Sequence, residues 1–166
     1  MTISNKHHFH PSIPIARSQT LGDILRRTAQ RLPEKTAVIC GKTQWSYAQF
    51  DALVSRLALG LVNVGIQSGD HVAMLARNSH GFAAMRFALA RMGAVLVPIN
   101  FMLKADEVAY ILRHAQAKVL VTDTELTPLA KAASALDTQV AEFIWIPSED
   151  PTPTSEGMHD FYALTE

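Results

Sequence analysis

The stretch from Gly69 to Asn100 constrains the fold more than any other part of the sequence. It begins with the apolar run Gly69–Leu75, continues with a helical pattern from Ser79 to Met92, and ends with a second apolar run, Gly93–Asn100. Short apolar strands separated by a helix are typical of a parallel sheet that is covered on both faces. The stretch therefore predicts a strand–helix–strand unit.

The same alternation continues toward the carboxyl end. Asp106 and Glu107 open a helical pattern, at a position where the helix dipole favours acidic side chains. A strand is expected at 118–122, a helix at 126–136 and a last strand at 140–146. The four predicted strands, centred near residues 72, 95, 119 and 143, are about 24 residues apart, which suits right-handed strand–helix–strand crossovers. The fold class we expect is α/β, with a mostly parallel sheet and helices on both faces.

Two helices are expected ahead of this sheet. Thr20 and Asp23 form a variant of the capping box at the start of the first helix, which Pro33 ends. The residues expected to form its apolar face are Leu21, Ile24, Leu25, Thr28 and Leu32. Ser46 and Gln49 form a second capping box. The helix that follows carries Phe50, Leu53, Val54, Leu57, Leu61 and Val64 on one face and ends at Gly65.

A β-hairpin is expected between these two helices. The short runs 37–40 and 43–46 flank Gly41-Lys42, a pair suited to a tight turn. The tripeptide Gly41-Lys42-Thr43 also copies the end of a phosphate-binding P-loop. The complete motif needs a glycine five residues earlier, where this chain has Thr36, and a helix directly after the loop. We therefore interpret Gly41 as a turn residue.

Composition changes at both ends of the predicted α/β region. Residues 1–18 contain Pro11 and Pro14 without a clear period and are predicted to form a flexible tail. Residues 19–146 form the expected α/β subdomain. Residues 147–166 are predicted to be a linker and the start of a truncated continuation, in which 158–164 could form one helical turn.

The overall composition excludes several classes of protein. Fifteen basic and fifteen acidic residues cancel and are scattered, which gives no electrostatic footprint for nucleic acid. Cys40 is the sole cysteine, so no internal disulfide can form. The sequence contains neither a signal-peptide pattern nor an apolar run of transmembrane length. We expect a cytoplasmic protein without a transmembrane segment.

Few residues offer chemistry of their own. Asp70, Asp106, Glu107 and Asp123 fall at predicted strand or helix ends, where α/β folds often bind ligands, although helix caps and solvated turns are the commoner use. His7, His8 and His10 lack carboxylate or thiolate partners nearby and are interpreted as part of a solvated terminus. From the residues alone we predict no catalytic, cofactor-binding or metal-binding residue.

Several segments together carry a resemblance to a known family. They are Thr20–Leu25, Trp45–Phe50, Gly69–Ala73, Arg77–Ser79 and Gly93–Phe101. In this order and at these spacings they resemble the amino-terminal part of the adenylate-forming (AMP-binding) enzymes, specifically the fatty-acyl-CoA synthetases. The resemblance covers about residues 20–165, and Phe161–Leu164 is similar to the segment just ahead of the family's signature loop.

The resemblance implies an activity for a longer enzyme. Such enzymes use ATP and magnesium to convert a carboxylic acid to an acyl-adenylate, and then transfer the acyl group to coenzyme A. Their phosphate loop, adenine-binding motif, magnesium-binding glutamate and catalytic lysine lie downstream of the region that this chain resembles. The resemblance therefore assigns no catalytic residue here, and no cofactor is expected for this fragment.

One position departs from the pattern of the family. Many relatives have Asn-x-Arg-Leu where this chain has Asn100-Phe101-Met102-Leu103, and in some of them the arginine contacts a phosphate of coenzyme A. Met102 has neither a charge nor a hydrogen-bond donor. Lys104 is an alternative cation two residues later, with a solvated lysine at a helix start as the other interpretation.

Two hypotheses about function follow. The chain is either the amino-terminal fragment of an acyl-CoA ligase, inactive alone, or a non-catalytic scaffold that binds a partner. A fragment of this kind would leave apolar sheet surface or an unpaired strand edge exposed. We therefore also expect self-association.

Overall fold

A parallel sheet forms the centre of the molecule in a computed structural model that describes residues 20–148 and 157–166. The strand order is β4-β3-β5-β6-β7, and every neighbouring pair is parallel. The strands are β3 (His71–Leu75), β4 (Val95–Pro98), β5 (Val119–Thr122), β6 (Glu142–Trp145) and β7 (His159–Asp160). Four of the five were predicted within a few residues of their observed positions.

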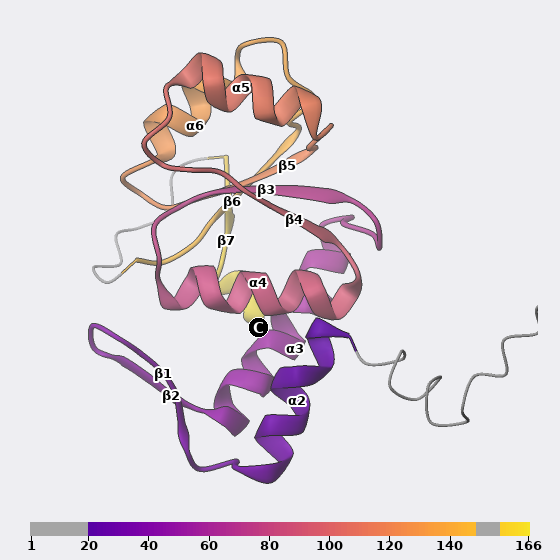
Figure 1. The fold of residues 1–166 in the computed structure, drawn as a ribbon, viewed down its shortest axis with the longest axis vertical. Coiled ribbons are helices and arrows are strands. Elements are labelled where there is room, and N and C mark those ends of the chain that lie inside the picture. The colour runs from indigo at the N-terminus through magenta and orange to yellow at the C-terminus, as the bar shows by residue number, and fades with distance from the viewer. Residues whose placement is uncertain (1–19, 149–156) are drawn as a thin grey trace, which may run out of the picture.

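Helices cover both faces of the sheet, as the apolar strands indicated. Figure 1 shows α5 (Ala105–His114) and α6 (Thr127–Ser134) on one side and α4 (His80–Met92) on the other, with α2 (Leu21–Arg31) and α3 (Tyr47–Asn63) beyond α4. Residues along β3 alternate between two cores. Val72 and Met74 pack with α3 and α4, whereas Ala73 and Leu75 pack with α5 and α6. The expected α/β class is confirmed.

The amino-terminal hairpin is also confirmed. Strands β1 (Thr36–Cys40) and β2 (Thr43–Ser46) are antiparallel, with Cys40 opposite Thr43. Gly41 between them has a φ of 55°, the left-handed conformation that glycine adopts most readily. The tripeptide Gly41-Lys42-Thr43 therefore belongs to a hairpin turn, and no helix follows it.

The capping signals at α3 and α4 are confirmed. The Ser46 hydroxyl accepts the Gln49 N–H at 3.3 Å, while the Gln49 side chain accepts the Ser46 N–H at 2.9 Å. The Ser79 hydroxyl accepts the Phe82 N–H at 3.1 Å. These side chains satisfy backbone donors that have no partner within the first turn of a helix.

The predicted apolar face of α2 is wrong. Of the expected row, Leu25 is buried, whereas Leu21, Ile24 and Leu32 are 44%, 56% and 44% exposed. The buried side instead carries Gly22, Leu25 and Ala29. A β-carbon on Gly22 would lie 2.8 Å from the Arg91 Cα, so α2 approaches α4 through its small residues and leaves larger apolar ones outside.

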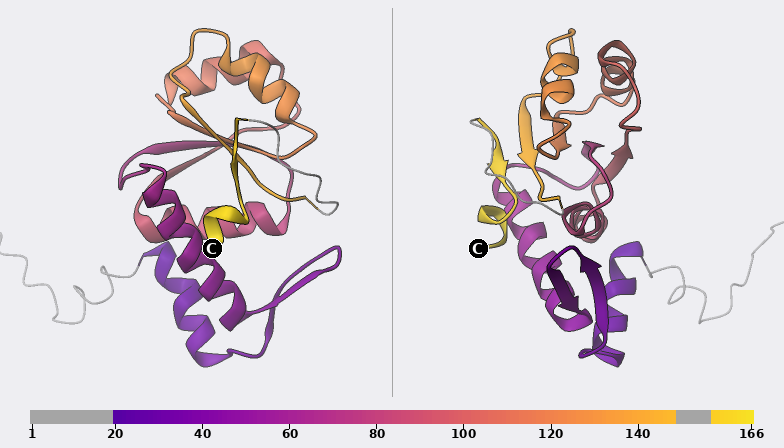
Figure 2. Two further views of the ribbon diagram at one scale, coloured as in Figure 1. Left: turned by 180° about the vertical axis from the view of Figure 1, so that it is seen from behind. Right: turned by 90° about the vertical axis from the view of Figure 1, so that its left-hand side faces the viewer.

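The carboxyl-terminal segment contains a strand that was not predicted. β7 pairs with β6, with Ile144 opposite His159 and Trp145 opposite Asp160. Phe161 is fully buried immediately after this strand, and a 3-10 turn, η1 (Ala163–Thr165), completes the described chain. Figure 2 shows this segment, in yellow, crossing beside β6 before it reaches the helices.

The domain limits at 1–18, 19–146 and 147–166 stay predictions, and residues 1–19 and 149–156 lie outside the described part of the chain. No helix within that part is long and apolar enough to cross a membrane.

Candidate functional site

The carboxyl ends of β3, β4, β5 and β6 meet along one edge of the sheet because these strands are parallel. Ligands of open α/β sheets bind outside this edge, in the loops that follow the strands. The candidate site therefore consists of the loops 76–79, 99–104, 123–126 and 146–148.

Asp123 organises this edge from a buried position. Its side chain is among the few buried charged groups, and the residue is 2% exposed. One carboxylate oxygen accepts the Arg77 N–H at 2.8 Å, and the other accepts the Leu126 N–H at 3.0 Å. The Thr127 hydroxyl donates to the Asp123 carbonyl at 2.8 Å. Each carboxylate oxygen thus accepts a hydrogen bond from a backbone N–H. These bonds support the interpretation of Asp123 as a cap of the loop and of the helix.

Arg77 brings a cation to the same edge. Its guanidinium forms an ion pair with Glu125 at 2.6 Å and lies 5.9 Å from the centroid of the Phe101 ring. The Arg77 side chain is 53% exposed. Met102 beside Phe101 is 79% exposed, with its N–H bound to the Asn100 side chain at 3.0 Å. The edge therefore presents the solvent-accessible Arg77 close to the loop that contains Met102. Met102 stands at the position where the family pattern has an arginine.

The other acidic candidates are divided between the two edges of the sheet. The Asp70 carboxylate accepts the Gln67 N–H at 2.8 Å in the turn before β3, at the opposite edge of the sheet. The Glu107 carboxylate accepts the Lys104 N–H at 2.9 Å, and Asp106 lies in the same first turn of α5. Lys104 itself is exposed. In residues 20–148 and 157–166, no three His, Cys, Asp or Glu side chains are placed to hold a metal ion.

His80 is a buried residue of this edge that the sequence reasoning missed. It opens α4 and is 2% exposed. Its Nε2 lies 3.4 Å from the Tyr162 hydroxyl, and its ring meets the Trp45 ring edge to face at a centroid distance of 5.3 Å. Its Nδ1 has no hydrogen-bond partner. Burial lowers the pKa of the His80 imidazole. A single histidine in an apolar surrounding leaves no periodic signal that could have revealed it.

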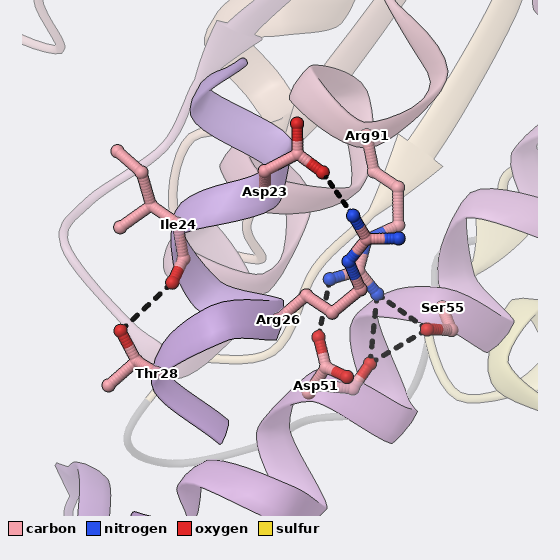
Figure 3. Close-up of polar contacts among 7 residues, drawn as sticks. All are labelled: Asp23, Ile24, Arg26, Thr28, Asp51, Ser55 and Arg91. Atoms are coloured by element: carbon pink, nitrogen blue, oxygen red, sulfur yellow. Dashed lines mark hydrogen bonds and ion pairs between the residues drawn. The ribbon is translucent and has the colours of Figure 1, made fainter. Parts of the chain in front are cut away.

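A second polar cluster lies away from the sheet, between α2, α3 and α4. Figure 3 shows Arg91 of α4 bound to Asp51 and Ser55 of α3, and Arg26 paired with Asp23 within α2. The Arg91 and Asp51 side chains are only 20% and 23% exposed. Because these groups satisfy one another across a helix interface, the cluster is explained by helix packing.

A cavity of the described part is also remote from the candidate edge. A cavity of about 530 Å³ lies at the amino ends of β3, β5 and β6, lined by the turns before these strands. Its polar lining includes Asp70, His71, Lys118 and Glu142. His71 Nδ1 is bound to the Ala115 carbonyl, and Glu142 pairs with His159 at 3.0 Å. These contacts leave the cavity without a convergent set of groups for one ligand.

Comparison with known proteins decides the family. A family model described as "AMP-binding enzyme" matches residues 25–161. The chain belongs to the AMP-binding enzyme family. The resemblance read from the ordered segments is thereby confirmed.

Relatives within this family include several CoA ligases. The chain is 38% identical over 107 residues to the peroxisomal benzoate–CoA ligase of Arabidopsis thaliana, covering 64% of this chain and 18% of the relative. It is 38% identical over 119 residues to a feruloyl-CoA synthase of Amycolatopsis, covering 72% and 24%. The chain therefore spans about a fifth of the length of the AMP-binding enzymes that it matches.

Solved structures of AMP-binding enzymes share the fold. The N-terminal domain of FACL13 from Mycobacterium tuberculosis has a TM-score of 0.73 at 35% identity, covering 76% of this chain and 34% of that one. The anthranilate CoA ligase AuaEII has a TM-score of 0.80 at 24% identity, covering 89% and 28%, and shows the fold alone. The architecture thus corresponds to the N-terminal region of these ligases.

The described residues do not fit the magnesium or triphosphate site that the family implies. Adenylyl transfer needs cations and convergent donors around the phosphates. The carboxyl edge supplies Arg77, already paired with Glu125, and the exposed Lys104, whereas each Asp123 carboxylate oxygen accepts a backbone N–H.

Proposed function

We propose that this chain is the amino-terminal portion of an ATP-dependent acyl-CoA ligase. The whole enzyme would use ATP and magnesium to activate a carboxylic acid, of fatty-acid type by the resemblance, as an acyl-adenylate. It would then transfer the acyl group to CoA in the cytoplasm. The observation that carries this proposal is the family match over 25–161, together with relatives named as CoA ligases.

Within that enzyme, residues 20–166 would act as a scaffold. Asp123 fixes the loop after β3 against the start of α6, and the segment from β7 to η1 docks on α3. Residues 1–166 alone would form neither acyl-adenylate nor acyl-CoA, because the described part offers no group of three side chains placed to hold a metal ion. The isolated chain would accordingly need no cofactor.

A second candidate function is a non-catalytic protein that binds a partner through exposed apolar residues. The feature that favours it is the outer side of α2, where Leu21, Ile24 and Leu32 face solvent. Such an unpartnered row is typical of a surface that another polypeptide covers.

A chimaera with a relative distinguishes the two candidates. Residues 20–166 would replace the homologous region of the Arabidopsis benzoate–CoA ligase, and formation of benzoyl-CoA from benzoate, ATP and CoA would be measured. We expect a folded chimaera that forms benzoyl-CoA, because the proposed role needs only a correctly folded scaffold. The unaltered ligase and the ligase without this region are the two controls. A chimaera that folds and yet forms no benzoyl-CoA would favour the non-catalytic alternative.

A further inference from the structure

We propose that His80 is a proton-sensitive junction, which in its neutral form fastens the β1–β2 hairpin and the carboxyl-terminal segment 157–166 to the start of α4. Protonation of the ring would loosen both attachments. The inference is independent of the ligase activity and concerns the chain as it stands.

Three separate parts of the chain meet at the start of α4. The hairpin contributes Trp45, whose ring packs edge to face with the His80 ring. The carboxyl-terminal segment contributes Tyr162, whose hydroxyl lies 3.4 Å from His80 Nε2. The chain after β6 lies against the neighbouring Gly81, where an added β-carbon would come within 2.8 Å of the Pro147 ring. The His80 ring therefore contacts two of these parts, the hairpin and the carboxyl-terminal segment, and the third lies against the next residue.

The surroundings of His80 accommodate a neutral ring better than a charged one. In a neutral imidazole one nitrogen donates and the other accepts, so Nδ1 can remain an unpaired acceptor while Nε2 meets Tyr162. Protonation turns Nδ1 into a buried N–H donor without an acceptor, which carries the desolvation penalty of an unsatisfied charged group. The ring also lies at the amino end of α4, where the helix dipole is positive and disfavours a cation. These effects act in the same direction.

The groups that face His80 do not compensate for a positive charge. Trp45 is uncharged, and Tyr162 is a phenol whose pKa is raised by burial and by the charge of Asp160. One Asp160 oxygen accepts the Tyr162 and Ala163 N–H groups at 2.7 and 3.1 Å. No carboxylate oxygen in the described part of the chain hydrogen-bonds to His80.

The carboxyl-terminal segment contains a second histidine. His159 of β7 lies 3.0 Å from the Glu142 carboxylate. A His159→Gln background removes this second titratable ring and isolates His80.

The size of the effect follows from proton linkage. If the ring has its ordinary pKa of about 6.5 when the junction is open, and stays neutral when the junction is closed, acidification from pH 7.5 to pH 5.5 favours opening about tenfold. The stabilisation from the neutral ring is fully present above the ordinary pKa and is lost as the pH falls below it. The loss is local, because the Arg56 side chain also donates a hydrogen bond to the Thr165 carbonyl at 2.7 Å.

Amide hydrogen exchange on the intact chain in the His159→Gln background tests the proposal. After correction for the intrinsic pH dependence of exchange, we expect protection of residues 43–46 and 159–162 to fall about tenfold between pH 7.5 and pH 5.5. His80→Phe keeps an aromatic ring beside Trp45 but cannot titrate, and should remove this dependence. His80→Asn serves the same purpose should the larger ring disturb folding.

Two controls make the result specific. His71→Asn changes an exposed histidine at the other edge of the sheet and should keep the full pH dependence. Tyr162→Phe removes the hydroxyl while retaining the ring, and should also keep it because the titrating group remains. Unchanged protection in the parent chain, or a dependence that persists in both His80 variants, would overturn the proposal.

Discussion

Gly60 of α3 lies against the carbonyl group of Leu164 so closely that a β-carbon in its place would come within 2.1 Å of the carbonyl oxygen. The contact joins the last turn of α3 to a residue more than one hundred positions later in the chain. Because the nearest atoms belong to backbone, no side-chain rotation can relieve a substitution. Glycine at position 60 thus permits the carboxyl-terminal segment to dock on α3.

Replacing Gly60 by alanine should therefore destabilise the protein. Alanine favours a helix over glycine by about 1 kcal/mol, but overpacking of a closed contact costs about 1–3 kcal/mol. We expect the free energy of unfolding to fall by about 1 kcal/mol or more, measured by urea denaturation. Leu59→Ala, at the neighbouring exposed position, should change it by less than about 0.5 kcal/mol. A Gly60→Ala protein as stable as the parent would contradict the contact.

Asp123 and Glu125 provide a matched pair of acidic residues around Arg77. Asp123→Ala leaves two backbone N–H groups without their buried carboxylate acceptor, and should lower the free energy of unfolding by about 3 kcal/mol. Glu125→Ala breaks an exposed ion pair and should cost at most about 1 kcal/mol. Thermal or urea unfolding of both variants provides the comparison. Equal effects would show that the Asp123 carboxylate does not have the capping role described above.

Ser46→Ala tests the helix cap that the sequence predicted. Loss of the hydroxyl leaves the Gln49 N–H without its acceptor and should cost about 1 kcal/mol of stability. In a full-length enzyme the substitution should leave ligand affinity unchanged. Gln49→Ala, which removes the reciprocal bond of the box, serves as the comparison. Unchanged stability with reduced ligand binding would instead give Ser46 a functional role.

Much of this architecture could be predicted because its signals are local. The strands β3, β4, β5 and β6 are continuous apolar runs, and α3 and α4 carry serine caps in front of long helical patterns. Each signal depends on neighbouring residues along the chain, so it can be read without knowing what packs against the element. The two-sided burial of the sheet follows from the same runs.

The missed features depend on contacts between distant parts of the chain. The solvent-facing side of α2 is more apolar than the side that packs against α4. The close approach of Gly22 to Arg91 determines which side of α2 is buried. β7 pairs through two residues, too few to show a strand period. His80 gains its properties from Trp45 and Tyr162, which lie 35 and 82 positions away. At the candidate edge, the position of Asp123 was anticipated, but its engagement with the Arg77 backbone was not.

Self-association stays a prediction, and the structure indicates where to test it. Helices cover both sheet faces, whereas β4 forms one edge of the described sheet and Val95 is 43% exposed. Pro98 has no backbone N–H, so it cannot donate a hydrogen bond to a strand that pairs at this edge. We expect light scattering over a hundredfold dilution to show a dimer or larger assembly that dissociates, and Val95→Lys to weaken it. Tyr110→Lys, on the exposed side of α5, is the control. A monomer at the highest concentration would contradict this expectation.

The most direct test of the scaffold account is acid-dependent release of pyrophosphate by purified residues 1–166. The chain would be incubated with ATP, magnesium, CoA and fatty or aromatic acids, with the Arabidopsis benzoate–CoA ligase as the positive control. We predict no release above that seen without acid, because the described residues include no group of three His, Cys, Asp or Glu side chains placed to hold the magnesium ion that adenylyl transfer needs. Pyrophosphate release that depends on the added acid would contradict it and would place a complete adenylation site within this chain.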